Sequence, residues 1–336
     1  MGEVIPFSLM SKDYDIYQKE GQEYKVYHDP GPPPVLDTSS NTTAQYQWGF
    51  MLVSQWAKQL NPLDETSWDI SPASMGNIPV TSWPNVFEEM KDFYRLEGGD
   101  QSFGRKMNPL TGEPYAPQRM LRADYARVLA EFWADGPDSE TPPGHWFTLL
   151  NYVSDHPNFE RRYRGQDEPL DPLEWDVKSY FILGVAMHDA AVAAWSVKGY
   201  YDYVRPISAL RYMAELGQST DPTLPNYHKW GLPLIEGYSE IVTEDDPLTK
   251  IYNCVGLIKL NTWREHAHVE EVDSIKVNFA ESGWILAKDW WPYQRIDFVT
   301  PPFAGYVSGH STFSRAAAEV MKTITGSEYF PGGRHI

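Results

Sequence analysis

The chain has 336 residues, of which 42% are hydrophobic and 14% aromatic, a composition typical of folded proteins rather than disordered ones. A formal net charge of −18 repels nucleic acid and anionic membranes, so we expect neither as a partner. The single cysteine, Cys254, excludes an internal disulfide and argues against a metal centre built on cysteines. We see no signal peptide and no apolar stretch of about 18 residues, so we expect no membrane span and assign no compartment.

Residues 1–117 are predicted to form a loop-rich region with a few helices. Residues 1–45 are polar and rich in turn formers, including the proline-rich run at 30–34. Apolar residues at helical spacing predict a helix over residues 46–60, which Pro62 closes. A shorter helix is predicted near Val86–Leu96.

Residues 118–336 are predicted to form a helical core that makes one continuous domain with the preceding region. Helical periodicity predicts helices over 123–135, 146–153, 175–198, 207–216, 251–271 and 311–325, and more weakly over 283–290. No convincing run of alternating apolar and polar residues predicts a strand. We therefore expect an all-α fold with long irregular connections.

Lys198 and Arg205 flank the turn expected between two of these helices. Gly199 and Pro206 argue against one continuous helix, so the first helix is predicted to end at Lys198–Gly199 and the next to begin at Pro206. An arginine fork and a lysine charge together suit an oxyanion such as phosphate or vanadate. The alternative is structural: Lys198 stabilises a helix C-terminus, and Arg205 pairs with Asp202.

The sequence Ser308-Gly309-His310-Ser311 precedes the last predicted helix. Free backbone N–H groups and the helix dipole favour an anion there. Gly309 allows close approach, the Ser308 hydroxyl is a donor, and His310 can transfer protons near neutral pH. The alternative is an ordinary N-cap serine followed by a turn glycine.

The other histidines give weaker signals. Residues 265–271 (EHAHVEE) resemble a metal cluster, but histidines two residues apart point to different faces of a helix. His188 is expected to lie in the core of the long helix. His145 and His156 have no evident partner in the sequence.

Lys198-x6-Arg205-Pro206 followed by Ser308-Gly309-His310 resembles two of the three motifs of the vanadium-dependent haloperoxidases. That family shares a fold with the type-2 phosphatidic acid phosphatases. The resemblance is to a bacterial branch and runs from about residue 55 to the C-terminus. It implies a helical bundle of this type and vanadate as the cofactor.

The resemblance also implies roles for individual residues. Lys198, Arg205, Ser308 and the Gly309 amide would bind the oxygens of vanadate, and His310 would be the catalytic acid–base group. Trp195 and Phe303 match positions that line the halide pocket in chloride-oxidising members of the family.

The implied reaction is the oxidation of a halide by hydrogen peroxide to hypohalous acid, through Lewis-acid activation of peroxide. Its partners would be hydrogen peroxide, a halide and an organic acceptor, and a homo-oligomer is allowed. One alternative is an acid phosphatase that uses the same pocket, since phosphate and vanadate have the same shape. The other is an anion-binding helical domain without turnover.

The sequence departs from the family pattern at two places. Val307 replaces the proline of Pro-Ser-Gly-His, and the third motif, Ser-Arg-x5-His, is absent because no histidine follows Ser314-Arg315 at that spacing. In the family this histidine binds vanadium directly. We therefore expect that ligand beyond Ile336, with this chain a fragment, and assign no metal ligand within it. His335 does not fit the spacing.

Overall fold

The computed structural model describes residues 5–38, 42–95, 102–132, 139–166, 168–264, 281–294 and 298–331. The described residues form these α-helices: α1 Thr42–Trp56, α2 Phe87–Phe93, α3 Arg122–Phe132, α4 Pro142–Asp155, α5 Pro172–Tyr201, α6 Pro206–Leu216 and α7 Gly309–Thr325. They also form these strands: β1 Tyr14–Lys19, β2 Gln22–Tyr27, β3 Ser67–Asp69, β4 Arg119–Leu121, β5 Ser239–Ile241, β6 Ile258–Trp263 and β7 Ser282–Leu286.

The expected all-α fold is wrong. Helix accounts for 43% and strand for 13%, and the strands form three sheets, so the fold is mixed α and β. Every pairing between these strands is antiparallel. One sheet joins β3 to β4 and so crosses the boundary at residues 117 and 118. The division into two regions at that boundary stays a prediction.

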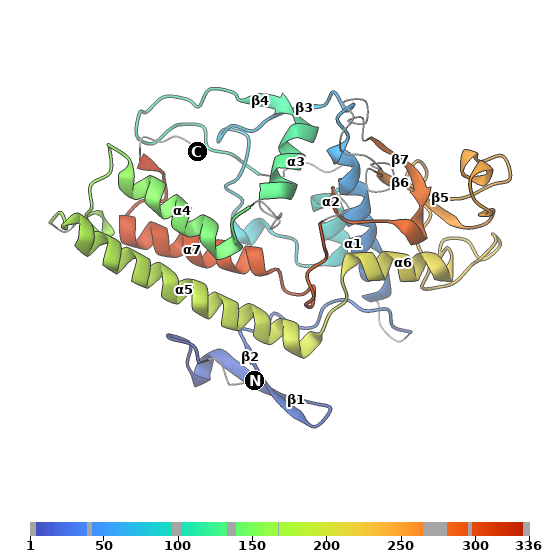
Figure 1. Ribbon diagram of the computed structural model, residues 1–336, viewed down its shortest axis with the longest axis horizontal. Helices are drawn as coiled ribbons and strands as arrows, with labels where there is room; N and C mark the ends of the chain where they lie inside the picture. The colour runs from blue at the N-terminus through green and yellow to red at the C-terminus, as the bar shows by residue number, and fades with distance from the viewer. Residues whose placement is uncertain are drawn as a thin grey trace.

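Helices α4, α5 and α7 pack side by side and form the first hydrophobic core (Figure 1). Leu183 and Met187 of α5 lie in this core together with Phe313 and Ala317 of α7. Thr141 caps α4 by accepting the N–H of Gly144, and prolines occupy the first turn of both α4 and α5. A proline costs little there because its missing N–H has no acceptor within the helix.

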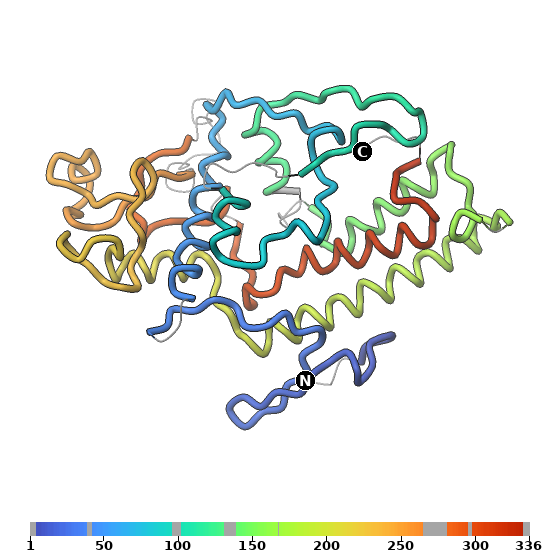
Figure 2. Tube along the Cα trace, turned by 180° about the vertical axis from the view of Figure 1, so that it is seen from behind, coloured from blue at the N-terminus to red at the C-terminus, as the bar shows by residue number. Residues whose placement is uncertain are grey.

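A second core lies where α1 and α6 meet the three-stranded sheet of β5, β6 and β7. Seen from behind, this part of the chain lies at the opposite end of the molecule from the α4–α5–α7 layer (Figure 2). Met51, Leu210, Leu260 and Trp290 are almost fully buried in it. Helices α5 and α6 are consecutive, so their junction lies where the two cores meet.

The helix predicted over 251–271 is wrong in its described part, because residues 258–263 form strand β6. Ile258, Leu260 and Thr262 are buried, and the residues between them are half-buried, which is the alternation of a strand. The weak helix predicted over 283–290 is also wrong. Strand β7 pairs with β6 there, and a 3-10 turn, Ala287–Asp289, follows it.

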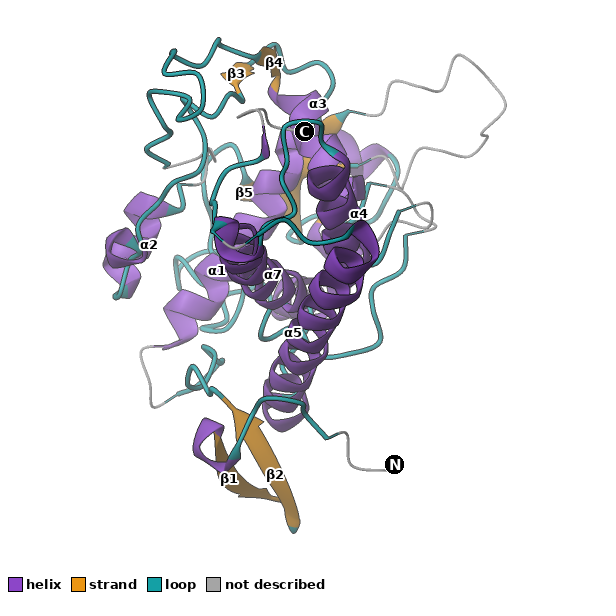
Figure 3. Cartoon of the chain, turned by 90° about the vertical axis from the view of Figure 1, so that its left-hand side faces the viewer, coloured by secondary structure: helices purple, strands orange, loops and turns teal. Residues whose placement is uncertain are grey.

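The N-terminal strands β1 and β2 form a hairpin that packs on α5, apart from the other sheets (Figure 3). Glu20 and Gly21 make its two-residue turn with φ values of 51° and 76°, the positive values that a type I′ hairpin turn requires. Tyr17 stacks on Tyr200 at the end of α5, with the two ring centroids 4.6 Å apart. From the sequence, residues 1–45 were described only as polar and rich in turn formers, so this folded hairpin was missed.

By length and composition, the helical span Pro172–Leu216 could cross a membrane, although no such stretch was seen in the sequence. One such span is weak evidence, because the core helix of a soluble protein meets the same criteria. Within this span, α5 packs against α4 and α7.

Candidate oxyanion site

The site is organised by the turn between α5 and α6. Helix α5 continues through Lys198 to Tyr201, past the predicted end, and Asp202 closes it in the left-handed conformation with φ of 45°. The N–H of Asp202 donates to the carbonyl of Lys198 at 2.9 Å. Arg205 is the N-cap of α6 and Pro206 its first residue, as predicted. Lys198 and Arg205 therefore flank a short turn.

Lys198 is a buried cation, with only 4% of the residue exposed. Its Nζ donates to the carbonyl of Ala304 at 2.7 Å, across 106 residues of sequence. Burial lowers the pKa of Lys198 to about 8, and the neighbouring charge of Arg205 acts in the same direction. The site thus holds a cation whose charge is poorly compensated by the protein itself.

Arg205 reaches the same segment. Its Nε donates to the carbonyl of Phe303 at 2.7 Å, and its guanidinium carbon lies 4.8 Å from the centroid of the Phe303 ring. Burial lowers the pKa of Arg205. Its Nη2 is buried and has no hydrogen-bond partner. A guanidinium nitrogen of this kind suits an oxyanion, which accepts planar N–H donors.

Residues 303–308 run from this pair of cations to the start of α7. The N–H of Gly305 donates to the carbonyl of Tyr203 at 2.8 Å. A Cβ at Gly305 would lie 2.8 Å from the carbonyl oxygen of Val204, closer than real Cβ contacts allow. Glycine is therefore required for this segment to approach the α5–α6 turn.

Ser308 is the N-cap of α7, as predicted, and its Oγ accepts the N–H of Ser311 at 3.2 Å. The Ser311 hydroxyl also donates to it, at 3.1 Å. These two bonds use the acceptor capacity of the Ser308 hydroxyl and leave its O–H as a donor for a ligand. Gly309 and His310 are the first residues of α7 and are half-buried.

Trp195 and Phe303 form an aromatic wall beside Lys198. Their ring centroids lie 5.1 Å apart, and the Lys198 Nζ lies 5.7 Å from the first ring and 5.2 Å from the second. Trp195 is 41% exposed and Phe303 is 40% exposed, so the wall faces an accessible space. A Cβ at Gly309 would meet the Trp195 ring at 3.2 Å. Trp195 therefore connects the two cations with the start of α7.

Two supporting contacts come from the proline-rich segment at 30–34 and were not anticipated. The Tyr306 hydroxyl donates to the carbonyl of Gly31 at 2.9 Å, and the Tyr203 hydroxyl donates to the carbonyl of Pro34. These bonds hold the turn and residues 303–308 against the N-terminal region. In the sequence, these contacts are indicated only indirectly, by the run of prolines that marks a rigid extended segment.

The remaining histidines lie elsewhere. His145 is buried and its Nδ1 lies 3.1 Å from Glu140, while His156 accepts the N–H of Asn158. His188 was expected to lie in the core, but it is only half-buried. Residues 265–271 and His335 lie outside the described residues. Where the structure is described, no group of three or more metal-ligating side chains could hold a metal ion.

The third motif has no counterpart after His310 in the described residues. Arg315 is mostly exposed and pairs with Glu319 along the surface of α7. Met321 occupies the position where the motif has histidine, and it is buried in the first core.

The family model of the VCPO second helical-bundle domain matches residues 178–221 and 247–335. The matched region contains Lys198, Arg205 and Ser308-Gly309-His310. Comparisons with curated proteins and with solved structures gave no significant match. The part matched by the family model, which is less than half of the chain, is therefore similar to a helical-bundle domain of this type. The match supports membership of the vanadium haloperoxidase family, and that family implies vanadate as the cofactor.

Proposed function

We propose that this protein binds vanadate between the α5–α6 turn and the start of α7, and that it oxidises halides with hydrogen peroxide. The observation that carries the proposal is the convergence of Lys198 and Arg205 on the segment that leads into α7. This convergence lies in the region that matches the family model. Two cations beside a segment that leads into a helix N-terminus favour a tetrahedral oxyanion.

The local chemistry fits such an anion. The buried Nη2 of Arg205 lacks a partner, and the depressed pKa of Lys198 would return towards its usual value beside a negative charge. The Ser308 hydroxyl accepts two hydrogen bonds, so its O–H can donate to the anion. The absence of a side chain at Gly309 leaves room beside Trp195.

Each residue has a distinct task in this proposal. Lys198 and Arg205 balance the anionic charge in a partly buried place, where the interaction is stronger than in water. Ser308 and the first N–H groups of α7 orient the anion, and the buried Nε2 of His310 moves protons. Vanadate, when bound, supplies a Lewis acid that activates peroxide. In the net reaction, halide, hydrogen peroxide and one proton give hypohalous acid and water.

The aromatic wall favours a halide over a phosphate ester. Trp195 and Phe303 present apolar surface beside Lys198, and a large, weakly hydrated anion tolerates such surface. A phosphate ester would need donors or water for its leaving group, and these two rings supply only the single N–H of the Trp195 indole. An acid phosphatase that uses the same site is therefore the second candidate function.

The test combines binding and turnover on the whole chain. Vanadate affinity and peroxide-dependent oxidation of iodide to triiodide are measured for the parent, Arg205→Gln and Arg211→Gln. Arg211 is a matched control, because it also lies on α6 and its Nε also donates to a carbonyl, that of Trp290. We expect Arg205→Gln to lose at least ten-fold in affinity and most of the oxidation, and Arg211→Gln to keep both.

Other outcomes overturn the proposal. Hydrolysis of a phosphate ester without vanadate-dependent halide oxidation would assign the site to an acid phosphatase. Vanadate binding that depends on Arg205 but gives no turnover in either assay would leave an anion-binding domain. Equal affinity in Arg205→Gln and the parent would place the anion elsewhere.

A further inference from the structure

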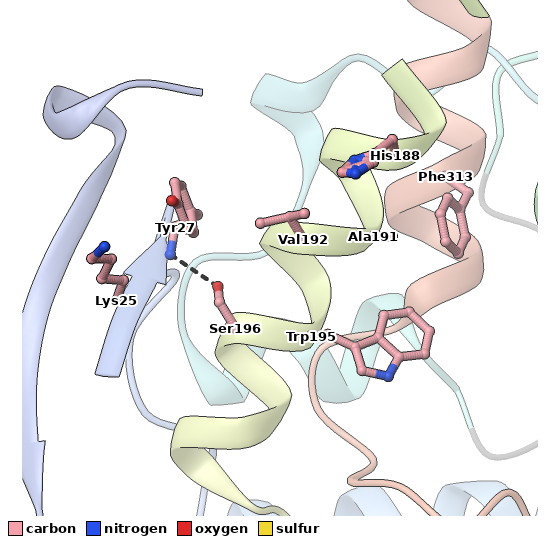
Figure 4. Close-up of a pocket in the computed structure, with 8 residues that line it drawn as sticks. All are labelled: Lys25, Tyr27, His188, Ala191, Val192, Trp195, Ser196 and Phe313. Carbon is pink, nitrogen blue, oxygen red and sulfur yellow. Dashed lines mark hydrogen bonds between the residues drawn. The ribbon is translucent and has the colours of Figure 1, made fainter. Parts of the chain in front are cut away.

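A cavity of about 560 Å³ lies beside the aromatic wall, between the hairpin strand β2, helix α5 and helix α7 (Figure 4). Its lining includes Tyr27 of β2, Val192 and Trp195 of α5, and Phe313 of α7. Figure 4 shows Trp195 and Phe313 on neighbouring helices at one end, with β2 across from them. The centroids of the Trp195 and Phe313 rings lie 6.2 Å apart.

The lining is largely apolar. Its Ser196 hydroxyl is engaged in hydrogen bonds, whereas the buried Nδ1 of His188 has no hydrogen-bond partner among the described residues and could take one polar group of a ligand. The Ser196 hydroxyl accepts the N–H of Tyr27 at 3.0 Å and donates to the carbonyl of Ala193 at 2.7 Å. The Lys25 ammonium, at the β2 side of the lining, lies 5.6 Å from the centroid of the Tyr14 ring. An uncharged ligand with a large apolar face therefore suits the cavity better than a charged one.

Trp195 connects this cavity with the oxyanion site. The same indole lies next to Phe303 and Lys198 on the site side and next to Phe313 and Val192 in the cavity. A ligand in the cavity would therefore be separated only by the Trp195 side chain from the place where hypohalous acid is proposed to form. A cavity of several hundred Å³ is also the usual size for a small organic ligand.

We infer that this cavity binds the organic acceptor of the halogen, and that the acceptor is an uncharged, electron-rich aromatic compound. The inference rests on the proposed haloperoxidase function. Hypohalous acid gives its halogen to a ring carbon, so the O–X and C–H bonds break. A C–X bond and an O–H bond of water form, the carbon is oxidised by two electrons, and the halogen is reduced.

A binding experiment tests the cavity without relying on turnover. The probe is 2-naphthol, and its affinity is measured by calorimetry for the parent chain, Val192→Trp and Val177→Trp. Val192 lines the cavity, whereas Val177 is an exposed residue of the same helix, 62% exposed, outside it. We expect Val192→Trp to weaken 2-naphthol binding at least ten-fold, whereas Val177→Trp should bind 2-naphthol within two-fold of the parent. The vanadate affinity of both variants should also stay within two-fold of the parent.

A second measurement tests the acceptor role. With bromide, peroxide and vanadate, bromination of 2-naphthol should fall at least five-fold in Val192→Trp, while oxidation of iodide to triiodide, which needs no organic acceptor, stays unchanged. Equal bromination by both variants would show that hypohalous acid reacts in solution, and would overturn the acceptor role. Ala191→Leu fills the same cavity and serves as the second variant if Val192→Trp does not fold.

The two proposals can fail separately. If the parent does not bind 2-naphthol, or if Val192→Trp binds it as tightly as the parent does, the cavity assignment is wrong whatever the halide assay shows. If 2-naphthol binding depends on Val192 but no vanadate-dependent halide oxidation occurs, the haloperoxidase proposal fails and the acceptor role fails with it. The cavity would then remain an aromatic-binding site only.

Discussion

At the scale of single residues, Lys198 is costly to the protein when no anion is bound. It is a cation with little exposure, next to a second cation, and its ammonium group, which carries three N–H donors, donates to the carbonyl of Ala304. A group arranged in this way binds protons more weakly than it would in water. Its charge therefore depends on whether a negative ligand is present.

We predict that affinity for vanadate or phosphate falls as pH rises through about 8, because Lys198 then loses its proton. The pKa is lower in the folded than in the unfolded state, so the unfolded chain binds more protons above pH 8. Without anion, stability should therefore rise between pH 8 and the usual lysine pKa of about 10.4.

The measurement for Lys198 is calorimetric titration with phosphate from pH 6 to pH 10, together with chemical unfolding over the same range. Lys198→Met should remove both the fall in affinity and the rise in stability. An affinity that stays flat across pH 8 in the parent would contradict the assignment of Lys198 to the site.

At this scale the sequence could suggest candidate side chains for the site but not the contacts that support them, and the roles of these side chains stay predictions. Lys198, Arg205 and Ser308 were chosen from spacing and residue type, and the structure brings Lys198 and Arg205 to one segment. The acceptor of Lys198 is a backbone carbonyl at Ala304, and backbone carbonyls carry no sequence signal. The bond between Tyr306 and Gly31 is equally invisible, because it joins residues 275 positions apart.

At the scale of elements, the start of α7 combines two functions in one residue. Ser308 caps the helix and is also the proposed donor to the anion. We predict that Ser308→Ala destabilises the protein by about 1 kcal/mol through loss of the cap. We also predict roughly ten-fold weaker vanadate binding, the usual effect of losing one hydrogen bond to a charged ligand.

Ser311→Ala is the matched control for this prediction. It removes the hydroxyl that donates to Ser308 but keeps the N–H that Ser308 caps. Urea unfolding and vanadate titration should show a smaller loss for Ser311→Ala than for Ser308→Ala. Equal losses would mean that the Ser308 hydroxyl has no direct contact with the anion.

A second prediction at this scale concerns the N-terminal segment. The Asp189 carboxylate of α5 accepts the N–H groups of Phe7 and Ser8 at 2.7 Å and the Ser8 hydroxyl. Burial alone would raise the pKa of Asp189, but these bonds outweigh it and the pKa is lowered. The bonds therefore stabilise the fold above the usual carboxyl pKa, and this contribution is lost as pH falls through the lowered value.

We predict that Asp189→Asn costs about 2 kcal/mol at pH 7, because an amide accepts fewer of these bonds and lacks the charge. Hydrogen exchange at Phe7 and Ser8 should become faster, while exchange in α4 should not change. A variant with parent-like exchange at both amides would show that the segment is held by other contacts.

The helices α6 and α7 were predicted well, whereas the strands were missed and two of them, β6 and β7, were predicted as helices. The range 207–216 and the range 311–325 agree closely with α6 and α7, because their apolar spacing, a proline at the start and Gly326 at the end are local signals. Strand β6 has the alternation Ile258, Leu260, Thr262, but it is short and its partners β5 and β7 are distant in sequence. Short strands depend on such pairing more than on intrinsic preference.

At the scale of the whole molecule, the proposed oxyanion site lies where the two hydrophobic cores meet. Helix α5 and helix α7 belong to the first core, and α6 belongs to the second. A bound anion that contacts Lys198, Arg205 and Ser308 would therefore link both cores. The net charge of −18 opposes any anion at long range, so this link depends on contacts made within the site.

We predict that vanadate at about 100 times its dissociation constant stabilises the fold by about 2.7 kcal/mol, which corresponds to a rise in Tm of roughly 4 °C. Hydrogen exchange should slow at the start of α6 and at the start of α7 together. Planar nitrate is the control and should give no shift. Slower exchange in one core alone would contradict a bridging anion.

The hairpin of β1 and β2 also affects how the chain is made. Its partner on α5 follows much later, since Tyr27 bonds to Ser196 across 169 residues. At roughly 5 to 20 residues per second, a ribosome needs about 10 to 30 s to synthesise the stretch between them. During that time the hairpin's tyrosines have no surface to cover them, and a two-stranded hairpin alone is marginally stable. The newly made segment of β1 and β2 therefore needs protection during translation until α5 has been made.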